Sequence, residues 1–299
     1  MKTIGIVGRG FVGNAIFEGM KHAFDVRCYD ASKGFSGHCK GLSMKAECLE
    51  PDAEPLQWIV CETDGPIFLC VPTPMRSDGS CNISIVESVI KELDDCMDAQ
   101  SCYDKRVIII KSTVVPGTTE RINDWCRNFH VCYNPEFLRE ATYLDDFKNQ
   151  DRIVIGGPHG GTKIVKQMYE TAYPDVQVTK TSSTIAELVK YFTNCFLAVK
   201  VSFANEIKEL CDKLEVDYDK VVEYGTKDKR VGNSHWSVPG PDGLSGFGGS
   251  CFPKDLNALM RLACSFEVPC ETMLGAWNTN LRVRPERDWE QLKGRAVDE

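Results

Sequence analysis

A cysteine flanked by glycines is the first candidate for chemistry in this sequence. It lies in the stretch Gly248-Gly-Ser-Cys251-Phe-Pro-Lys254-Asp255, just before an expected helix. The positive end of a helix dipole and a nearby cation stabilise a thiolate. Glycines leave room for a substrate carbon, and Asp255, one turn later, can face the same site. The stretch predicts a nucleophile at Cys251, and the alternative is a glycine-rich loop with an inert cysteine.

A second glycine pattern, Gly8-Arg-Gly10-Phe-Val-Gly13, stands between an expected strand and an expected helix. Such glycines form a tight turn, let the backbone approach a pyrophosphate and let the helix pack on the strand. The helix N-terminus supplies N–H donors to phosphates. Asp30, at the end of the next expected strand, can accept hydrogen bonds from the adenosine ribose, which favours NAD over NADP. The predicted cofactor contacts are Gly8, Gly10, Phe11, Val12, Gly13 and Asp30.

Two further sets of polar residues could serve carbonyl chemistry. Lys190 and Asn194 are four residues apart on an expected helix, so both donors can face one oxyanion. Asn134-Pro-Glu136-Phe-Leu-Arg139-Glu140 follows an expected strand, at the edge where open α/β sheets bind ligands. There Glu136 is a candidate base and Glu140 a candidate cofactor contact. The alternatives are a solvated helix face and ordinary turn chemistry.

The elements that would position these residues follow from the alternation of short β-rich runs with amphipathic segments. That alternation is typical of a parallel sheet covered by helices. The expected strands are Thr3–Val7, Asp25–Tyr29, Pro66–Val71, Arg106–Lys111, His130–Tyr133 and Arg152–Ile155. The expected helices of this part are Ile83–Met97 and Thr118–Arg127. Residues 31–64 are expected to form an irregular excursion, and Thr73 and Thr113, which follow strands, could meet the nicotinamide.

The pattern changes at residue 183, where a long helical run begins that Ser183 or Thr184 can cap. We expect a Rossmann-like, doubly wound parallel sheet that binds NAD over residues 1–182. A long spine helix should then lead into a small all-α domain over 183–281, with a further helix at Asp255–Phe266. A polar, peripheral tail is expected over 282–299.

Composition restricts the class of protein. The 299 residues are 42% hydrophobic and 26% charged, as in soluble globular proteins, and no apolar run approaches the roughly 20 residues of a membrane span. A formal charge of −8 without a basic patch argues against nucleic-acid or membrane partners. Fifteen cysteines without a CxxC pair make a metal site or a disulfide framework unexpected. With no signal peptide recognised, we expect a cytoplasmic protein.

Taken together, the motifs resemble the UDP-glucose dehydrogenases and their relatives that oxidise GDP-mannose and N-acetylated UDP-sugars. Six segments occur in the family's order over about residues 1–280: GRGFVG, VPTP, KSTVVPGTT, NPEFLRE, AELVKYFTN and GFGGSCFPKD. The resemblance implies NAD-dependent oxidation of a nucleotide-sugar CH₂OH to a carboxylate through a thioester. UDP-glucose is the first choice of substrate, and GDP-mannose or a UDP-N-acetylhexosamine is the alternative.

The resemblance also implies a role for each matched residue. Cys251 would attack the aldehyde, Lys190 and Asn194 would stabilise oxyanions, and Glu136, Asp255 and Thr113 would assist hydrolysis. Arg230 would reach the substrate of a neighbouring subunit, which implies a homodimer built on the spine helix. The implied cofactor contacts add Lys33, Thr73, Thr113 and Glu140. The implied substrate contacts are Glu136, Phe137, Leu138, Arg139, Lys190, Asn194, Arg230, Phe247, Gly248, Gly249 and Cys251.

The sequence departs from the family in two places. The excursion over 31–64 lacks the usual EPGL-type segment, although Lys33 is retained, and the family's third, nucleotide-binding domain would begin where these residues end. Two other functions stay open. A β-hydroxyacid dehydrogenase has a similar size and a Lys-x-x-x-Asn pattern but needs no cysteine. A non-catalytic module would only bind NAD or dimerise.

Overall fold

The computed structural model describes residues 2–38, 54–98 and 105–298, and it groups the chain into two compact units. The first unit comprises Met1–Thr73 and Ile83–Lys190. The second comprises Pro74–Asn82 and Tyr191–Glu299. Part of the expected irregular excursion, residues 39–53, lies outside the described residues. The domain boundaries expected at 182 and 281 stay a prediction.

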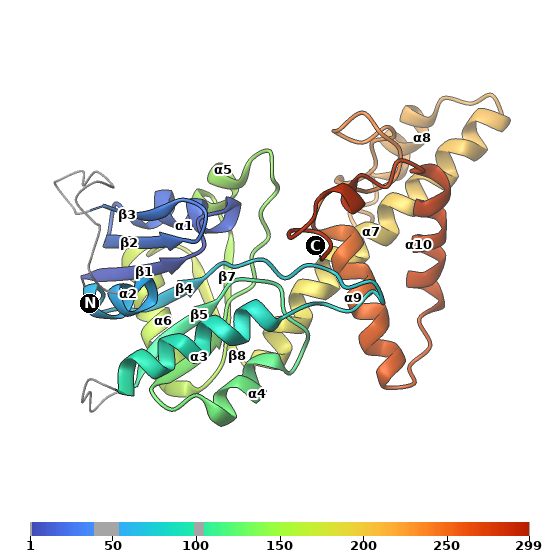
Figure 1. The fold of residues 1–299 in the computed structure, drawn as a ribbon. Coiled ribbons are helices and arrows are strands. Elements are labelled where there is room, and N and C mark those ends of the chain that lie inside the picture. The colour runs from blue at the N-terminus through green and yellow to red at the C-terminus, as the bar shows by residue number, and fades with distance from the viewer. Residues whose placement is uncertain (1, 39–53, 99–104, 299) are drawn as a thin grey trace. The chain divides into compact units, whose positions relative to one another are not determined.

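The first unit is built on one eight-stranded sheet (Figure 1), with the strand order β3-β2-β1-β4-β5-β6-β7-β8. The strands are β1 (Thr3–Val7), β2 (Asp25–Asp30), β3 (Gly34–His38), β4 (Ile67–Leu69), β5 (Arg106–Ile110), β6 (Phe129–Tyr133), β7 (Arg152–Gly156) and β8 (Gln177–Thr181). The pairing is parallel except for β3 on β2 and β7 on β6. β1 lies between β2 and β4, so the strand order reverses there, as at a Rossmann ligand-binding edge.

Helices cover both faces of this sheet (Figure 1). They are α1 (Phe11–Met20), α2 (Pro55–Glu62), α3 (Ser84–Asp98), α4 (Thr118–Trp125), α5 (Tyr143–Lys148) and α6 (His159–Ala172). The strands are apolar on both faces, so both faces need a cover. In β5, Ile108 and Ile110 lie in one apolar core while Val107 and Ile109 lie in the other. The predicted α/β class with a doubly wound parallel sheet is confirmed, and the two antiparallel pairs were not predicted.

The predicted spine helix is α7 (Ser183–Lys213), of which residues up to Lys190 group with the first unit. Its expected cap is wrong by one residue. The Ser182 hydroxyl, rather than that of Ser183 or Thr184, accepts a hydrogen bond from the Ile185 N–H at 3.3 Å. That is the N-cap pattern one position earlier.

The second unit adds helices to α7: α8 (Tyr218–Gly225), α9 (Phe252–Ser265), α10 (Glu271–Val283) and the short 3₁₀ helix η2 (Asp288–Gln291). The segment 74–82 also belongs to the second unit, because Met75 forms β-bridges with Cys81 and Val297. The expectation of a peripheral tail over residues 282–299 is wrong for its buried residues. Arg284 and Trp289 are only 2% and 1% exposed, because they pack under the neighbouring loop and α10. No helix among the described residues is long and apolar enough to cross a membrane.

Candidate functional site

The glycine turn after β1 has the geometry that the sequence predicted. Gly8 takes φ +88°, and a Cβ there would lie 2.5 Å from the Cys70 carbonyl oxygen. A Cβ on Gly13 would overlap the Gly8 oxygen, so the start of α1 packs directly on the turn. Gly10 faces open space, with nothing within 4 Å of an added Cβ. A tight turn, a close helix and an open approach are what a pyrophosphate at this helix N-terminus requires.

Asp30 is held in place by its neighbours at the end of β2. Its carboxylate accepts hydrogen bonds from the Arg9 N–H at 2.6 Å and from the Ser32 N–H and hydroxyl at 3.0 and 2.6 Å. Burial favours the neutral acid, yet these hydrogen bonds and the Lys33 charge lower the pKa of Asp30. Lys33 donates to the Arg9 carbonyl at 2.6 Å. Asp30 is therefore an anion aligned with the glycine turn, suited to ribose hydroxyls and opposed to a 2′-phosphate.

The other expected cofactor contacts lie in the same unit. Thr73 and Thr113 are buried in the segments that follow β4 and β5. Phe11 and Val12 form the first turn of α1, where the Phe11 ring contacts Tyr143 edge-on at 5.3 Å. Glu140 lies exposed between β6 and α5. Their roles toward NAD stay predictions.

Glu136 and Lys190 form a buried ion pair. The Lys190 ammonium donates to Glu136 Oε1 and to the Glu136 carbonyl, each at 2.7 Å, while the Leu138 N–H donates to Oε2 at 2.8 Å. Burial would favour neutral Glu136, but the Lys190 charge and these hydrogen bonds lower its pKa. A carboxylate and an ammonium thus meet at the carboxyl end of β6, as an acid–base site would need.

Lys111, at the end of β5, is a buried cation that the sequence reasoning missed. Its ammonium donates to Asn134 Oδ1 at 2.9 Å and to the Pro135 carbonyl at 3.3 Å. Burial lowers the pKa of Lys111 to about 8. Two lysines therefore hold the Asn134–Glu136 segment. The sequence did contain a signal for this burial. Lys111 directly follows the apolar run Ile108–Ile110 of an expected buried strand, whereas lysines are usually found in polar, exposed segments.

The three expected substrate contacts that follow Glu136 in the sequence have different surroundings. The Phe137 ring lies near two cations, with the Arg152 guanidinium 4.7 Å and the Lys190 ammonium 5.9 Å from its centre. Leu138 packs against an apolar core of the sheet. The exposed Arg139 instead pairs with Asp146 at 2.6 Å. The structure therefore groups Phe137 with Glu136 and Lys190 but directs Arg139 to a local ion pair.

In the second unit, Asp255 is the centre of a buried charged group. Asn194 Nδ2 donates to Asp255 Oδ2 at 2.6 Å, and the Lys254 ammonium donates to Oδ1 at 2.5 Å. Burial would lower the pKa of Lys254, but the Asp255 carboxylate raises it above its usual range. Lys190 and Asn194, predicted as a pair of donors, thus each bond a different carboxylate.

Cys251 lies at the N-terminus of α9, whose first helical hydrogen bond runs from the Asp255 N–H to the Cys251 carbonyl at 2.9 Å. The thiol is partly exposed and lies 3.8 Å from the Ser250 hydroxyl. The Cys251 sulfur also interacts with the buried Lys254 charge. A helix N-terminus and an ammonium are the surroundings that favour a thiolate.

The loop before Cys251 is shaped by its glycines. Gly249 takes φ +69°, a left-handed conformation that favours glycine. A Cβ on Gly248 would overlap the side chains of Arg284 and Asp288. Phe247 is buried beside them. The sequence reasoning missed Arg284 and Asp288, since both stand in the segment expected to be a tail.

Arg230, expected to reach another subunit's substrate, is exposed on the segment after α8. Its guanidinium forms hydrogen bonds with the Asp228 carboxylate, from Nε at 3.0 Å and from Nη2 at 2.5 Å. The Asp228 partner orients Arg230 within its own loop. Its role toward a substrate stays a prediction.

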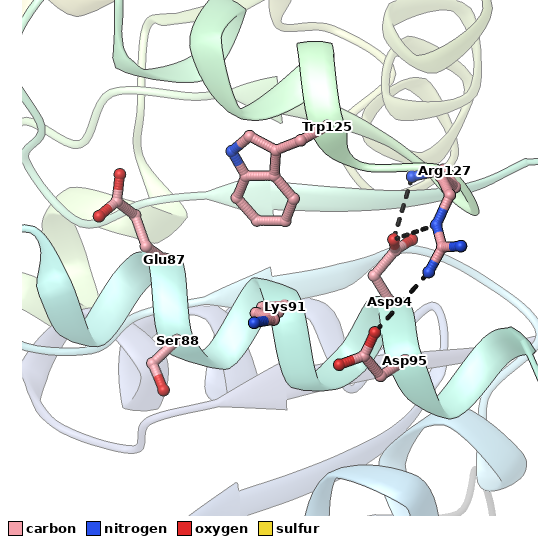
Figure 2. A pocket seen from close by; sticks show the side chains of 7 residues that line it. All are labelled: Glu87, Ser88, Lys91, Asp94, Asp95, Trp125 and Arg127. Carbon is pink, nitrogen blue, oxygen red and sulfur yellow. Dashed lines mark hydrogen bonds and ion pairs between the residues drawn. The ribbon is translucent and has the colours of Figure 1, made fainter.

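A hollow of about 540 Å³ lies elsewhere in the first unit, between α3 and the end of α4 (Figure 2). Its lining is mostly charged, and Arg127 lies 3.9 Å from both Asp94 and Asp95. Arg127 precedes β6, so this hollow lies toward the amino end of that strand, whereas the glycine turn follows the carboxyl end of β1. We therefore do not assign it to the cofactor. Among the described residues, no group of His, Cys, Asp and Glu could hold a metal ion.

Comparison with known families matches both parts of the chain. Residues 60–173 match the NAD-binding domain of the UDP-glucose/GDP-mannose dehydrogenase family, and residues 184–282 match the central domain of the same family. UDP-glucose 6-dehydrogenase TuaD of Bacillus subtilis is 33% identical over 226 residues, which are 73% of this chain and 46% of that protein. The chain spans about half the length of the curated relatives it matches.

Solved structures agree in fold. A UDP-glucose dehydrogenase from Pyrobaculum islandicum superposes with a TM-score of 0.80 at 29% identity, covering 98% of this chain and 70% of that one. A 3-hydroxyisobutyrate dehydrogenase from Mycobacterium tuberculosis superposes with a TM-score of 0.68 over 96% of this chain and 95% of that one. Its identity is only 15%, so this second likeness concerns the fold alone.

Proposed function

Because the chain belongs to the UDP-glucose/GDP-mannose dehydrogenase family, we propose that it oxidises the CH₂OH group of a nucleotide sugar to a carboxylate with NAD⁺. UDP-glucose is the proposed substrate, and GDP-mannose or a UDP-N-acetylhexosamine is the alternative. The first unit contains the family's NAD-binding domain, and its glycine turn and Asp30 fit that cofactor. NAD⁺ held there would supply the hydride acceptor for both oxidations.

The residues of the chain would then handle oxygen, sulfur and protons. The alcohol oxygen first gives its proton to Glu136, which passes it to solvent, and Lys190 and Asn194 stabilise the resulting alkoxide while its carbon gives up a hydride. The Cys251 thiolate adds to the aldehyde carbon and forms a thiohemiacetal, which keeps the aldehyde bound. Loss of a second hydride leaves a thioester. Water then breaks the C–S bond, with its protons accepted by Glu136 and Asp255, and the carboxylate leaves.

The observation that carries this proposal is the surroundings of Cys251 in the second unit. The thiol stands at the N-terminus of a 14-residue helix whose first turn contains the buried Lys254–Asp255 pair. Asn194 holds the second oxygen of that same carboxylate. A single-step β-hydroxyacid oxidation would need no thiol at such a place, and a module that only binds NAD would not need the buried charges.

The stoichiometry of the reaction tests the proposal. Purified chain is incubated with limiting UDP-glucose, GDP-mannose or UDP-N-acetylhexosamine and excess NAD⁺, and NADH is followed by absorbance. Two NADH per sugar, with a uronate as product, support the four-electron reaction. One NADH per substrate favours a single-step dehydrogenase. Binding of NAD⁺ without NADH from any of the three sugars overturns the proposed activity for this chain.

We further propose that the chain forms a homodimer through α7. Phe192 and Phe196, one turn apart on this helix, are 71% and 60% exposed, and Phe203 and Leu210 continue the same apolar row. Burying side chains of this size contributes about 1.5–3 kcal/mol each. An exposed row on a 31-residue helix suits pairing with a second copy, which would bring Arg230 toward the partner's site.

A further inference from the structure

The loop that leads to Cys251 is fixed by side chains from three helices of the second unit. The Gly246 N–H donates to Asn205 Oδ1 of α7 at 3.1 Å. Asn280 of α10, fully buried, bonds both the N–H and the carbonyl of Phe247, at 2.7 and 3.0 Å. The Gly249 N–H donates to Asp288 Oδ2 of η2 at 2.8 Å. The backbone groups of Gly246, Phe247 and Gly249 thus bond side chains where those of a mobile glycine loop would bond water.

Arg284 in turn holds Asp288, the partner of the Gly249 N–H. Its Nε donates to Asp288 Oδ1 at 2.6 Å, its Nη2 to Asp242 Oδ2 at 2.6 Å and its Nη1 to the Ser245 carbonyl at 3.3 Å. Burial would favour the neutral acid, but the Arg284 fork and the Gly249 N–H lower the pKa of Asp288. Arg284 is only 2% exposed, and a buried charge is tolerated only with such partners.

The absence of a side chain at Gly248 lets the Arg284–Asp288 pair contact the loop. A Cβ at this position would overlap Arg284 Nη2 and Asp288 Oδ1, so only a bare backbone lets the guanidinium–carboxylate pair lie against it. The pair therefore bonds the backbone at Gly249 and packs on Gly248, two and three residues before Cys251.

We propose that Arg284 and Asp288 are positioning residues that hold the Gly248–Cys251 loop, and with it the Cys251 thiol, at the N-terminus of α9. This inference rests on the proposed role of Cys251 as the nucleophile. The thiolate gains from the helix N-terminus and from Lys254 only while its backbone stays at the first turn, since dipole effects fall off within one turn. Loosening the loop therefore raises the pH at which Cys251 becomes a thiolate.

The matched control is Asp242. Its carboxylate pairs with the same guanidinium, at the same 2.6 Å, but its other oxygen accepts from the Leu244 N–H rather than from Gly249. Asp242→Asn therefore weakens the ion pair without removing the bond to Gly249. Asp288→Ala removes both the Arg284–Asp288 ion pair and the bond to the Gly249 N–H. Arg284→Lys keeps the positive charge but cannot form all three hydrogen bonds of the guanidinium.

The experiment measures how the rate of Cys251 alkylation by iodoacetamide depends on pH, followed on its own peptide by mass spectrometry. Exposed Cys264 in the same chain serves as the reference thiol. The midpoint of the pH profile reports thiolate formation and does not depend on how accessible the thiol is. Thermal unfolding of each variant shows that the compared chains are folded.

We expect Asp288→Ala and Arg284→Lys to raise the Cys251 midpoint by about half a pH unit or more, which is a threefold or greater shift of the thiol–thiolate equilibrium toward the thiol. Asp242→Asn should stay within a twofold change, and Cys264 should not move. An unchanged midpoint in the folded Asp288→Ala or Arg284→Lys chain, or an equal shift in Asp242→Asn, overturns the inference. NADH formation decides the proposed function separately: activity with no midpoint shift rejects only the positioning role, and a shift without activity rejects only the activity.

Discussion

Lys190 and Glu136 approach to 2.7 Å in an environment where neither side chain is more than 9% exposed. The pair joins α7 to the segment after β6, and the same ammonium also holds the Glu136 carbonyl. A buried pair of this kind does little for stability when both members are present, because desolvation offsets the attraction. Either partner left alone is costly. The relationship therefore gives a prediction that does not depend on catalysis.

Removing both members of this pair should destabilise the chain by less than the two single removals add up to. We expect Lys190→Met and Glu136→Gln each to lower the free energy of unfolding by about 3–5 kcal/mol, since each leaves the other group buried without its partner. The double variant should lose less than the sum, and urea denaturation of the four proteins measures the coupling. Additive losses would show that the two charges do not depend on each other.

Glu187, three residues before Lys190, should make stability depend on pH. Burial raises its pKa to about 7, although the Gly117 and Thr119 N–H groups and the Thr119 hydroxyl donate to it. A carboxyl whose folded pKa lies above its unfolded value favours folding at low pH and loses that contribution as pH rises through about 7. Relative to Glu187→Gln, the wild type should lose up to about 3 kcal/mol between pH 4.5 and 8. Denaturation curves of both proteins across that range measure it, and parallel curves would contradict it.

Asp30 should set the choice of cofactor. We expect Asp30→Ala to weaken NAD⁺ binding and to reduce discrimination against NADP⁺ about tenfold, because the carboxylate that accepts ribose hydroxyls and repels a 2′-phosphate is gone. Ser32→Ala is the control, since it removes one donor to Asp30 and keeps the charge. Titration of both cofactors by fluorescence gives the affinities. A wild type that binds NADP⁺ more tightly than NAD⁺ would show that Asp30 does not face the ribose.

The strands were the most predictable part of the structure, for a physical reason. Runs such as Val107–Ile110 are buried on both faces of a parallel sheet, so they read as continuous apolar segments. Strand β8, at the sheet edge, has mostly exposed or partly exposed polar residues and was missed. Helix α6 was also missed, because Gly160 and Gly161 stand in its first turn.

The candidate site divides in a similar way. Glycine turns and the cysteine motif could be predicted because backbone geometry requires those residue types locally. Arg284 could not, because a charged residue is buried only when other residues supply its hydrogen bonds, and Asp288 could not, because the Gly249 N–H that it accepts from lies 39 residues away. Arg284 takes partners 39 to 42 residues away in the sequence, which no local pattern records. The supposed tail was therefore assigned from polarity alone.

Dimerisation should depend on the apolar row of α7. Phe192→Glu with Phe196→Glu places charges where an apolar partner face is proposed, so we expect association to weaken at least a hundredfold. The control is Phe266→Glu, an equally exposed phenylalanine at 71% that follows α9. Sedimentation at micromolar concentration compares the three proteins. A wild type that sediments as a monomer removes both the dimer and the proposed contact of Arg230 with a partner's substrate.

The variant Cys251→Ser separates the possible functions most sharply. Serine keeps the size and hydrogen bonding of cysteine, but its hydroxyl is a far poorer nucleophile near pH 7 than a partly ionised thiol. If Cys251 forms the thioester, the variant should still carry out the first oxidation, while acid release falls by about a thousandfold or more. Burst kinetics of NADH formation and mass spectrometry of the sugar products measure the two steps.

The control is Cys195→Ser, a buried thiol that donates to the Asp255 carbonyl at 3.6 Å, a bond that a hydroxyl can also make. It should leave the double oxidation within a few-fold of the wild type. Alkylation should abolish turnover, with substrate protecting Cys251, because a thiolate at a helix N-terminus reacts ahead of buried thiols. A single-step dehydrogenase would tolerate Cys251→Ser with unchanged product. Full conversion to the acid by Cys251→Ser at the wild-type rate would exclude the thioester, and the reaction would then have to depend on Lys190 and Glu136 alone.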